Sequence, residues 1–169
     1  RKLYNLKNFG IRNAEEVESV GANAKMNEFC AAMGLCNLRH IEESITKRKI
    51  LVERYKELLS KVNGIVACEQ QQDVDSNYSY FPILVDPDAY GHDRDYVFEK
   101  LKEQDVFARK YFYPITNSFD CFKGQFDPEQ TPIALSISKQ VLTLPLYPDL
   151  SLNVVDKICA IIMESAGEY

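Results

Sequence analysis

A long segment without proline limits the possible folds of this chain more than any other feature. It begins near Asn27 and contains one glycine, Gly34, before Asn63-Gly64. Asn27 is a favourable N-cap residue, and Gly64 suits a left-handed C-cap. Apolar residues follow the three- and four-residue spacing of a helix face: Leu38, Ile41, Ile45, Val52, Tyr55, Leu59 and Val62. The pattern predicts one long amphipathic helix, or two nearly collinear helices, over residues 27–62.

The first turns of this segment are apolar on most sides. They contain Phe29, Ala31, Ala32, Met33, Leu35 and Cys36. A helix that is apolar all round is normally buried between layers of structure. We therefore expect the segment to join two domains, with its first turns at an interface and its later turns packed on a sheet.

Short strand-like and helix-like stretches alternate after this segment. Residues that favour β structure predict strands at 65–68, 78–85, 106–113 and 141–144, and helical patterns predict helices at 93–104, 132–140 and from Ser151 onward. Pro82 lacks a backbone donor, so we expect it at a sheet edge or a bulge. The alternation favours an α/β fold in which helices cover a sheet.

Composition excludes several classes of protein. The formal net charge of −5 argues against a general nucleic-acid-binding surface. The apolar runs are far shorter than the ~20 residues that span a bilayer. The five cysteines form no CxxC pair, and His40 and His92 lie far apart, so we expect neither a disulfide framework nor a metal site. Reduced, mostly buried thiols in a cytoplasmic protein are the expectation.

The start of the chain has the character of an internal segment. The first residue is Arg1, and the first 20 residues are polar and interrupted by asparagine and glycine. We expect irregular structure there, without a core of its own. The chain is interpreted as a fragment of a longer protein.

The loop that leads into the long helical segment is the first candidate binding site. A loop that ends at a helix N-terminus presents free backbone N–H groups to an anion. Asn23 adds a side-chain donor and Lys25 adds a positive charge. The alternative interpretation is a capped helix start with a solvated lysine.

A basic and aromatic segment is the second candidate. If residues 106–113 form a strand, then Arg109, Tyr111 and Tyr113 share one face, because alternate residues of a strand point the same way. A guanidinium beside two phenol rings suits a phosphorylated or hydroxylated ligand. The alternative is cross-strand aromatic packing with an exposed arginine. The basic run 47–49 is interpreted as a solvated helix face.

Four ordered motifs resemble those of one protein family. They are Asn8-Phe9-Gly10, the segment 21–28 (GANAKMNE) followed by 31–35 (AAMGL), the run 47–49 (KRK) with Tyr55, and the segment 144–151 (LPLYPDLS). Together they resemble the C-terminal part of the DegT/DnrJ/EryC1/StrS sugar aminotransferases, over nearly the whole chain.

The resemblance implies the fold of aspartate aminotransferase, known as fold type I, with a large domain that binds pyridoxal 5′-phosphate (PLP) and a small C-terminal domain. It assigns residues 1–26 to the tail of the large domain, 27–62 to a connecting helix region and 63–169 to an α+β small domain. The Schiff-base lysine of the family lies upstream of Asn8. The resemblance therefore implies that no catalytic residue lies in this chain, which should be inactive alone.

The same resemblance implies a substrate and a set of binding residues. The most similar subgroup aminates nucleotide-linked 4-keto-6-deoxyhexoses, with glutamate as the expected amino donor. Asn23 would bind the PLP phosphate, and Lys25, Arg109, Tyr111 and Tyr113 are the candidates for the sugar-nucleotide side.

The expected enzyme is a homodimer that binds neither nucleic acid nor membrane. Two alternatives stay open. One is a PLP-dependent sugar dehydratase, in which histidine replaces the catalytic lysine. The other is a binding module without catalysis.

Overall fold

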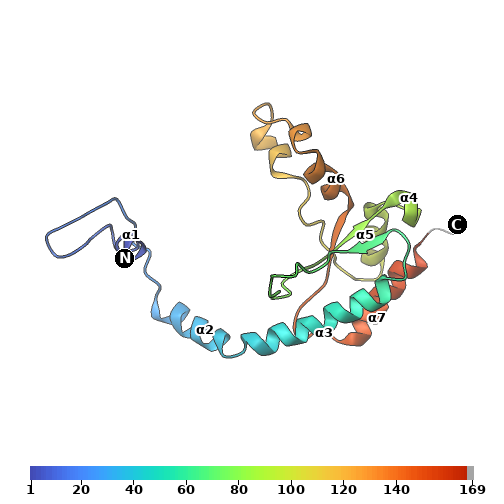
Figure 1. Cartoon of the computed structure of the whole chain (residues 1–169), viewed down its shortest axis with the longest axis horizontal. Coiled ribbons are helices and arrows are strands. Elements are labelled where there is room, and N and C mark those ends of the chain that lie inside the picture. Colours follow the sequence, from blue (N-terminus) through green and yellow to red (C-terminus); the bar gives the residue numbers. More distant parts are fainter. Residues whose placement is uncertain (167–169) are drawn as a thin grey trace. The chain divides into compact units, whose positions relative to one another are not determined.

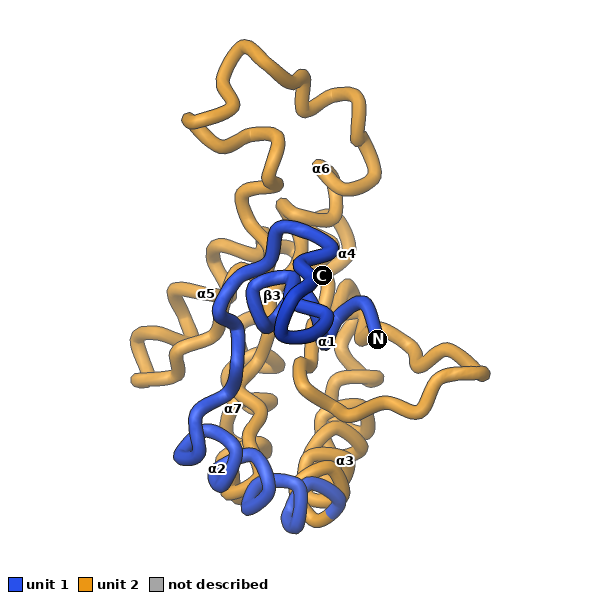
Figure 2. Tube along the Cα trace, turned by 90° about the vertical axis from the view of Figure 1, so that its left-hand side faces the viewer, with its two compact units in different colours: residues 1–42 blue, residues 43–169 orange. Residues whose placement is uncertain are grey.

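The chain divides into two compact units, which are coloured separately in Figure 2. The computed structural model describes residues 1–166 (Figure 1). Unit 1 contains Arg1–Glu42 and unit 2 contains Glu43–Tyr169. The predicted small domain runs to residue 169, and its last three residues lie outside the described part.

Unit 1 begins with a short helix where irregular structure was predicted. Helix α1 spans Lys2–Leu6, and the chain then forms a loop that returns to it. The Ala22 N–H donates to the Leu6 carbonyl at 2.9 Å, and the Phe9 N–H donates to the Ala22 carbonyl at 3.1 Å. The backbone hydrogen bonds therefore close the loop without a large apolar core.

The proline-free segment forms two helices, which was one of the predicted alternatives. Helix α2 spans Glu28–Leu38, and α3 spans Ile41–Leu59. The Asn27 carboxamide oxygen accepts from the Cys30 N–H at 2.8 Å, which confirms the N-cap. No residue of α2 is buried, and Phe29 is 89% exposed. Burial of this helix at an interface stays a prediction about a longer protein.

Unit 2 is built on a three-stranded antiparallel sheet with the order β1-β2-β3. The strands are β1 (Ile65–Ala67), β2 (Phe81–Val85) and β3 (Val141–Leu144). The other elements are α4 (Pro87–Tyr90), α5 (Arg94–Glu103), three 3₁₀ turns at Thr116–Ser118, Asp120–Phe122 and Pro128–Gln130, α6 (Pro132–Gln140) and α7 (Leu152–Glu164). This mixture of helices with one antiparallel sheet agrees with the α+β small domain expected from the resemblance.

One face of the sheet and three helices form the core. In β2, Phe81, Ile83 and Val85 are buried and alternate with half-buried residues. Helices α3, α5 and α7 supply about half of the buried core residues: Leu51, Val52, Tyr55, Leu59, Val97, Leu101, Val155, Ile158, Cys159 and Ile162. Burying each large apolar side chain contributes about 1.5–3 kcal/mol relative to exposure.

Two predictions about strands need correction. Residues 106–113 do not form a strand, because pairing is limited to an isolated bridge between Arg109 and Thr143. The expected edge position of Pro82 holds only locally, since β2 is the central strand of the sheet. The pairing of β1 with β2 ends at Ala67 and Ile83. Pro82 is the next residue of β2, and the position opposite it lies one residue beyond the end of β1. The sheet is two strands wide at that point, which explains how the proline is tolerated.

The thiols are free, as expected, but most of them are exposed. Cys30, Cys36, Cys68 and Cys121 are exposed, and Cys159 in α7 is buried. Burial, and then the nearby Asp156 carboxylate, raises the pKa of Cys159 to about 12. The expectation of mostly buried thiols is therefore wrong.

We expect Gly64→Ala to destabilise unit 2 more than Gly124→Ala. Both glycines have positive φ, +77° and +81°, but a Cβ at Gly64 would lie 2.4 Å from the Tyr90 nitrogen, and one at Gly124 would meet nothing within 4 Å. Left-handed backbone costs about 1–2 kcal/mol for alanine, and the close contact at Gly64 adds roughly 1–3 kcal/mol. Thermal unfolding of the intact protein measures the difference. Equal losses would contradict the close approach.

We expect Cys159 to resist alkylation at pH 8, because the thiolate is the reactive form and a pKa of about 12 leaves little of it. Cys68 and Cys121 are exposed and should react within minutes. Mass spectrometry of the labelled protein identifies the modified thiols, and labelling in denaturant provides the control. Modification of folded Cys159 as fast as Cys121 would contradict the burial.

Candidate functional site

The candidate site residues lie in both units. Asn23 and Lys25 belong to unit 1, whereas Arg109, Tyr111 and Tyr113 belong to unit 2.

Asn23 lies where the backbone of unit 1 is held on both sides. It forms an isolated antiparallel bridge with Asn8, and the adjacent Ala24 N–H donates to the Lys7 carbonyl at 2.9 Å. Among the described residues, no hydrogen bond of the Asn23 carboxamide is found, and the residue is exposed. The ammonium of Lys25 lies 5.6 Å from the ring centroid of Phe9. The loop thus presents an amide and a cation on a fixed backbone.

In unit 2, Arg109 and Tyr111 lie together at the end of β3. Two backbone hydrogen bonds, of 3.0 and 2.7 Å, join Arg109 to Thr143. The guanidinium of Arg109 lies 5.6 Å from the ring centroid of Tyr111, and Tyr80 meets that ring edge to face at 5.5 Å. A cavity of about 170 Å³ is lined by Ser79, Tyr80, Phe107, Arg109, Tyr111, Thr143, Leu144, Pro145 and Leu146. The cavity combines one cation with aromatic walls.

Tyr113 does not share a strand face with Arg109 and Tyr111 as predicted. The Tyr111 N–H donates to the Arg109 carbonyl at 3.0 Å, and the Tyr113 N–H donates to the Lys110 carbonyl at 2.8 Å. These short-range hydrogen bonds turn the chain instead of extending it. Tyr113 instead stacks on Arg94, whose guanidinium carbon lies 4.9 Å from its ring centroid.

Sequence reasoning missed two residues beside this segment, Tyr80 and Arg94. Tyr80 was placed in a predicted strand, and a partner for its ring could not be seen in the local pattern. Arg94 lies in the predicted helix 93–104, and the sequence pattern assigns it no role. The sequence contains one signal for Arg94, which is a cation in the first turn of the predicted helix. Such a cation opposes the helix dipole and requires compensation by nearby groups.

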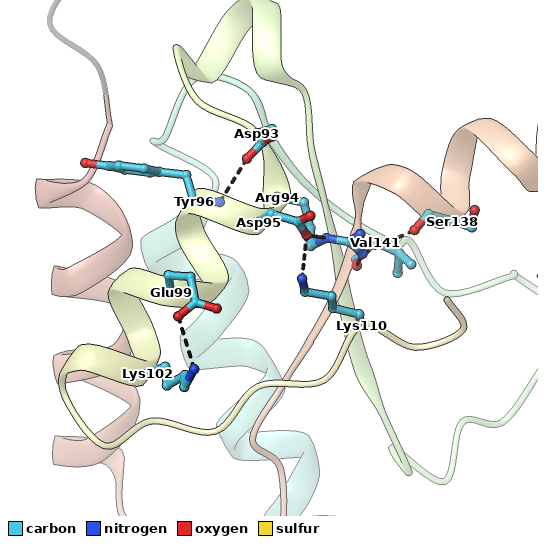
Figure 3. A network of polar contacts seen from close by, with 9 residues as sticks. All are labelled: Asp93, Arg94, Asp95, Tyr96, Glu99, Lys102, Lys110, Ser138 and Val141. Atoms are coloured by element: carbon cyan, nitrogen blue, oxygen red, sulfur yellow. Dashed lines mark hydrogen bonds and ion pairs between the residues drawn. The ribbon is translucent and has the colours of Figure 1, made fainter. Parts of the chain in front are cut away.

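Arg94 is compensated by the groups around it (Figure 3). Its side chain is 2% exposed. One guanidinium nitrogen, Nη1, donates to the carbonyls of Val141 at 2.9 Å and Ser138 at 3.2 Å, and Nε donates to Asp95 at 2.5 Å. The Lys110 ammonium lies 2.7 Å from the same Asp95 oxygen. Burial opposes ionisation of Asp95, but hydrogen bonds from Lys110 and Arg94 outweigh it and hold the pKa of Asp95 below its ordinary value.

The basic run 47–49 is only partly a solvated face. Lys47 pairs with Glu43 at 2.8 Å, and Lys49 lies 3.8 Å from Glu53, so both lysines stay on the helix surface. Arg48 instead donates to the Asn77 carbonyl through Nη2 at 2.7 Å and Nε at 3.2 Å. This arginine holds the loop that leads to Tyr80.

Comparison with known proteins identifies the family. The model of the DegT/DnrJ/EryC1/StrS aminotransferase family matches residues 1–163. The chain belongs to this family. It is 42% identical over 164 residues to dTDP-4-amino-4,6-dideoxy-D-glucose transaminase of Escherichia coli, covering 96% of this chain and 44% of that protein. The protein of the same name from Shigella dysenteriae is 35% identical, with 96% and 44% covered.

Solved structures of family members share the fold. DesI in the presence of its TDP-sugar product matches with a TM-score of 0.84 and 28% identity, over 96% of this chain and 41% of that chain. S. venezuelae DesV in complex with a ketimine intermediate matches with a TM-score of 0.87 and 24% identity, over 99% of this chain and 44% of that chain, which supports the fold alone. The chain thus spans less than half the length of the relatives that it matches.

The aminotransferases of this family depend on PLP, and a solved relative from Streptococcus pneumoniae is described in its PLP form. In this chain the exposed carboxamide of Asn23 fits the cofactor phosphate, because its NH₂ group is a hydrogen-bond donor. Within residues 1–166, no cluster of three or more metal-ligating side chains occurs. None of the described helices has the length and apolar character needed to cross a bilayer.

Proposed function

We propose that the chain is the C-terminal part of a PLP-dependent aminotransferase that aminates a nucleotide-linked keto-deoxysugar. Glutamate is the proposed amino donor, and the product would serve deoxysugar or cell-surface polysaccharide biosynthesis. The 42% identity to a dTDP-sugar transaminase over 96% of the chain is the observation that carries the proposal.

We assign residues 1–26 to the tail of the large domain, 27–62 to the connecting helices and 63–169 to the small domain. The border between the two compact units, at Glu42 and Glu43, falls inside the proposed connector. The sheet begins at Ile65, just after it.

The proposed binding roles follow from the chemistry of each side chain. Asn23 donates to the PLP phosphate, and Lys25 adds positive charge on the sugar-nucleotide side. The forked guanidinium of Arg109 matches the oxygens of a pyrophosphate, and the rings of Tyr111 and Tyr113 offer stacking surfaces and hydroxyl donors. When bound, PLP supplies an electron sink and carries the amino group.

The intact enzyme is proposed to be a cytoplasmic homodimer. Free thiols are typical of a reducing compartment, and the cysteines of residues 1–166 are free. In a two-fold dimer both subunits use the same surface patch at the interface. An exposed apolar helix such as α2 can therefore be covered by the partner subunit. We propose that Asn23 serves the active site of the neighbouring subunit.

The alternative is a sugar dehydratase of the same fold, or a binding module without catalysis. An activity assay of the intact protein separates them. It supplies glutamate, PLP and a dTDP-4-keto-6-deoxyhexose, and analyses the product by mass spectrometry. An aminated sugar supports the transaminase, loss of water without amination supports the dehydratase, and an unchanged sugar with retained binding supports the module.

We expect Arg109→Ala to raise the KM of the nucleotide sugar by about one to two decades, since a charge-assisted hydrogen bond contributes roughly 1.5–3 kcal/mol. The half-reaction with the amino donor should keep its rate. Lys123→Ala, which removes an exposed cation elsewhere in unit 2, is the matched control. Equal losses for both substrates would assign Arg109 a structural role.

We expect Asn23→Ala to raise the dissociation constant for PLP about tenfold, while the melting temperature stays within ~2 °C. Asn13 provides the control because its carboxamide closes a turn, accepting from the N–H groups of Glu15 at 2.9 Å and Glu16 at 3.0 Å. Asn13→Ala should lower the melting temperature without changing PLP affinity. The opposite pattern for the two variants would refute phosphate binding by Asn23.

A mixed dimer tests the cross-subunit role. Asn23→Ala chains are combined with chains that lack the Schiff-base lysine. If Asn23 serves the neighbouring subunit, one site of the mixed dimer contains both the working lysine and an intact Asn23, and activity recovers. Confirmed mixed dimers without recovery would place Asn23 in its own subunit's site.

The 169-residue chain should form no Schiff base with PLP on one specific lysine, because the catalytic lysine is proposed to lie upstream. The chain is mixed with PLP, reduced with borohydride and mapped by mass spectrometry. A stoichiometric adduct on a single lysine would overturn this expectation, and scattered substoichiometric labelling is the expected background.

A further inference from the structure

Arg94 is placed where a cation is physically unfavourable. It is the first residue of α5, and its side chain is 2% exposed. The positive end of the helix dipole lies at this terminus, and burial removes the solvation of the charge. A buried cation in such a position is retained only where its partners are well placed.

The partners of Arg94 come from three other parts of unit 2. Ser138 belongs to the last turn of α6, and Val141 begins β3, so their carbonyls lie at the negative end of one helix and at the start of a strand. The last carbonyls of a helix have no partner within the helix, and the guanidinium supplies one. The third partner is the ring of Tyr113, 4.9 Å from the guanidinium carbon.

The same helix start also fixes Lys110. The Oδ1 atom of Asp95 accepts from Arg94 at 2.5 Å and lies 2.7 Å from the Lys110 ammonium (Figure 3). Lys110 also lies over the ring of Phe98, at 4.6 Å from its centroid. The segment 109–113 is therefore held at Lys110 and Tyr113 from α5, and at Arg109 by the backbone of β3.

Tyr111 lies between these anchors, and it lines the cavity together with Arg109. We propose that Arg94 is a positioning residue for the nucleotide-sugar site, whose guanidinium holds Tyr113 and, through Asp95, Lys110, so that Arg109 and Tyr111 keep one orientation toward the ligand. This inference rests on the proposed function, because the proposed function is the source of the assignment of a nucleotide sugar to the cavity.

The test separates positioning from general stability in the intact enzyme. Arg94→Lys keeps the charge but loses the planar face and the fork that meets several partners. We expect a rise of about tenfold in the KM of the nucleotide sugar, as a desolvated cation–π contact and one hydrogen bond would give. The half-reaction with the amino donor, followed by the absorbance change of the cofactor, should stay within about twofold.

Arg54→Ala is the matched control. Arg54 forms a forked ion pair with Asp156, at 2.7 and 3.2 Å, which joins α3 to α7 away from the segment 109–113. Its loss should lower the melting temperature without separating the two half-reactions. If Arg94→Lys gives the same pattern as Arg54→Ala, the positioning role is overturned.

A double-mutant cycle tests the route through Tyr113. In a Tyr113→Leu background the stacking partner is absent, so Arg94→Lys should add less than about twofold to the KM. Additive effects would overturn the proposed route. If Arg94→Lys does not fold, Asp95→Asn replaces it, because Asp95 is 56% exposed and its loss releases Lys110. An unchanged KM in that variant would overturn the inference.

The behaviour of the wild-type enzyme distinguishes failure of the proposed function from failure of the positioning role of Arg94. A wild type that binds no nucleotide sugar overturns the proposed function and the positioning role with it. An active wild type whose Arg94→Lys variant keeps its nucleotide-sugar KM overturns the positioning role alone.

Discussion

Burial of one face of the central strand β2 supports the rest of unit 2. The apolar side chains Phe81, Ile83 and Val85 would be exposed to water on a bare sheet, and α3, α5 and α7 cover them. Tyr55 of α3 stacks on Phe81 at 4.9 Å, and its hydroxyl donates to the Pro145 carbonyl at 3.0 Å. One helix residue thus joins the apolar core to the chain that leaves β3. In Figure 1 this core lies where α3 and α7 run beside the sheet.

The candidate site depends on this core through the backbone of β3. Arg109 and Thr143 exchange two hydrogen bonds, which attach an otherwise irregular segment to a buried strand. Beyond that bridge the segment turns, and Arg109 and Tyr111 come to line one cavity. Binding residues on loops held by a rigid scaffold are a common arrangement, because the loop can vary without loss of the core. The same arrangement in this chain allows Tyr80, from the loop before β2, to meet Tyr111.

Charge at the start of α5 is balanced across several elements. Arg94 alone would be costly there, since both burial and the helix dipole oppose its charge. The carbonyls of Ser138 and Val141 and the carboxylate of Asp95 offset this cost, and Asp95 also accepts from Lys110. The network therefore couples the helix start, the α6–β3 junction and the candidate binding segment.

Local signals in the sequence were enough for the helices within residues 27–62 and for the strands of the sheet. Asn27 caps α2 because its side chain reaches an N–H three residues away. The stretches predicted at 65–68, 78–85 and 141–144 pair as strands over 65–67, 81–85 and 141–144. The ordered motifs also led to the family, which the comparison confirmed. The anchoring of the segment 109–113 and the partners of Arg94 were beyond such signals. Arg109 is held by Thr143, and the carbonyls that accept from Arg94 lie more than 40 residues away from it along the chain, so the folded core alone brings these groups together.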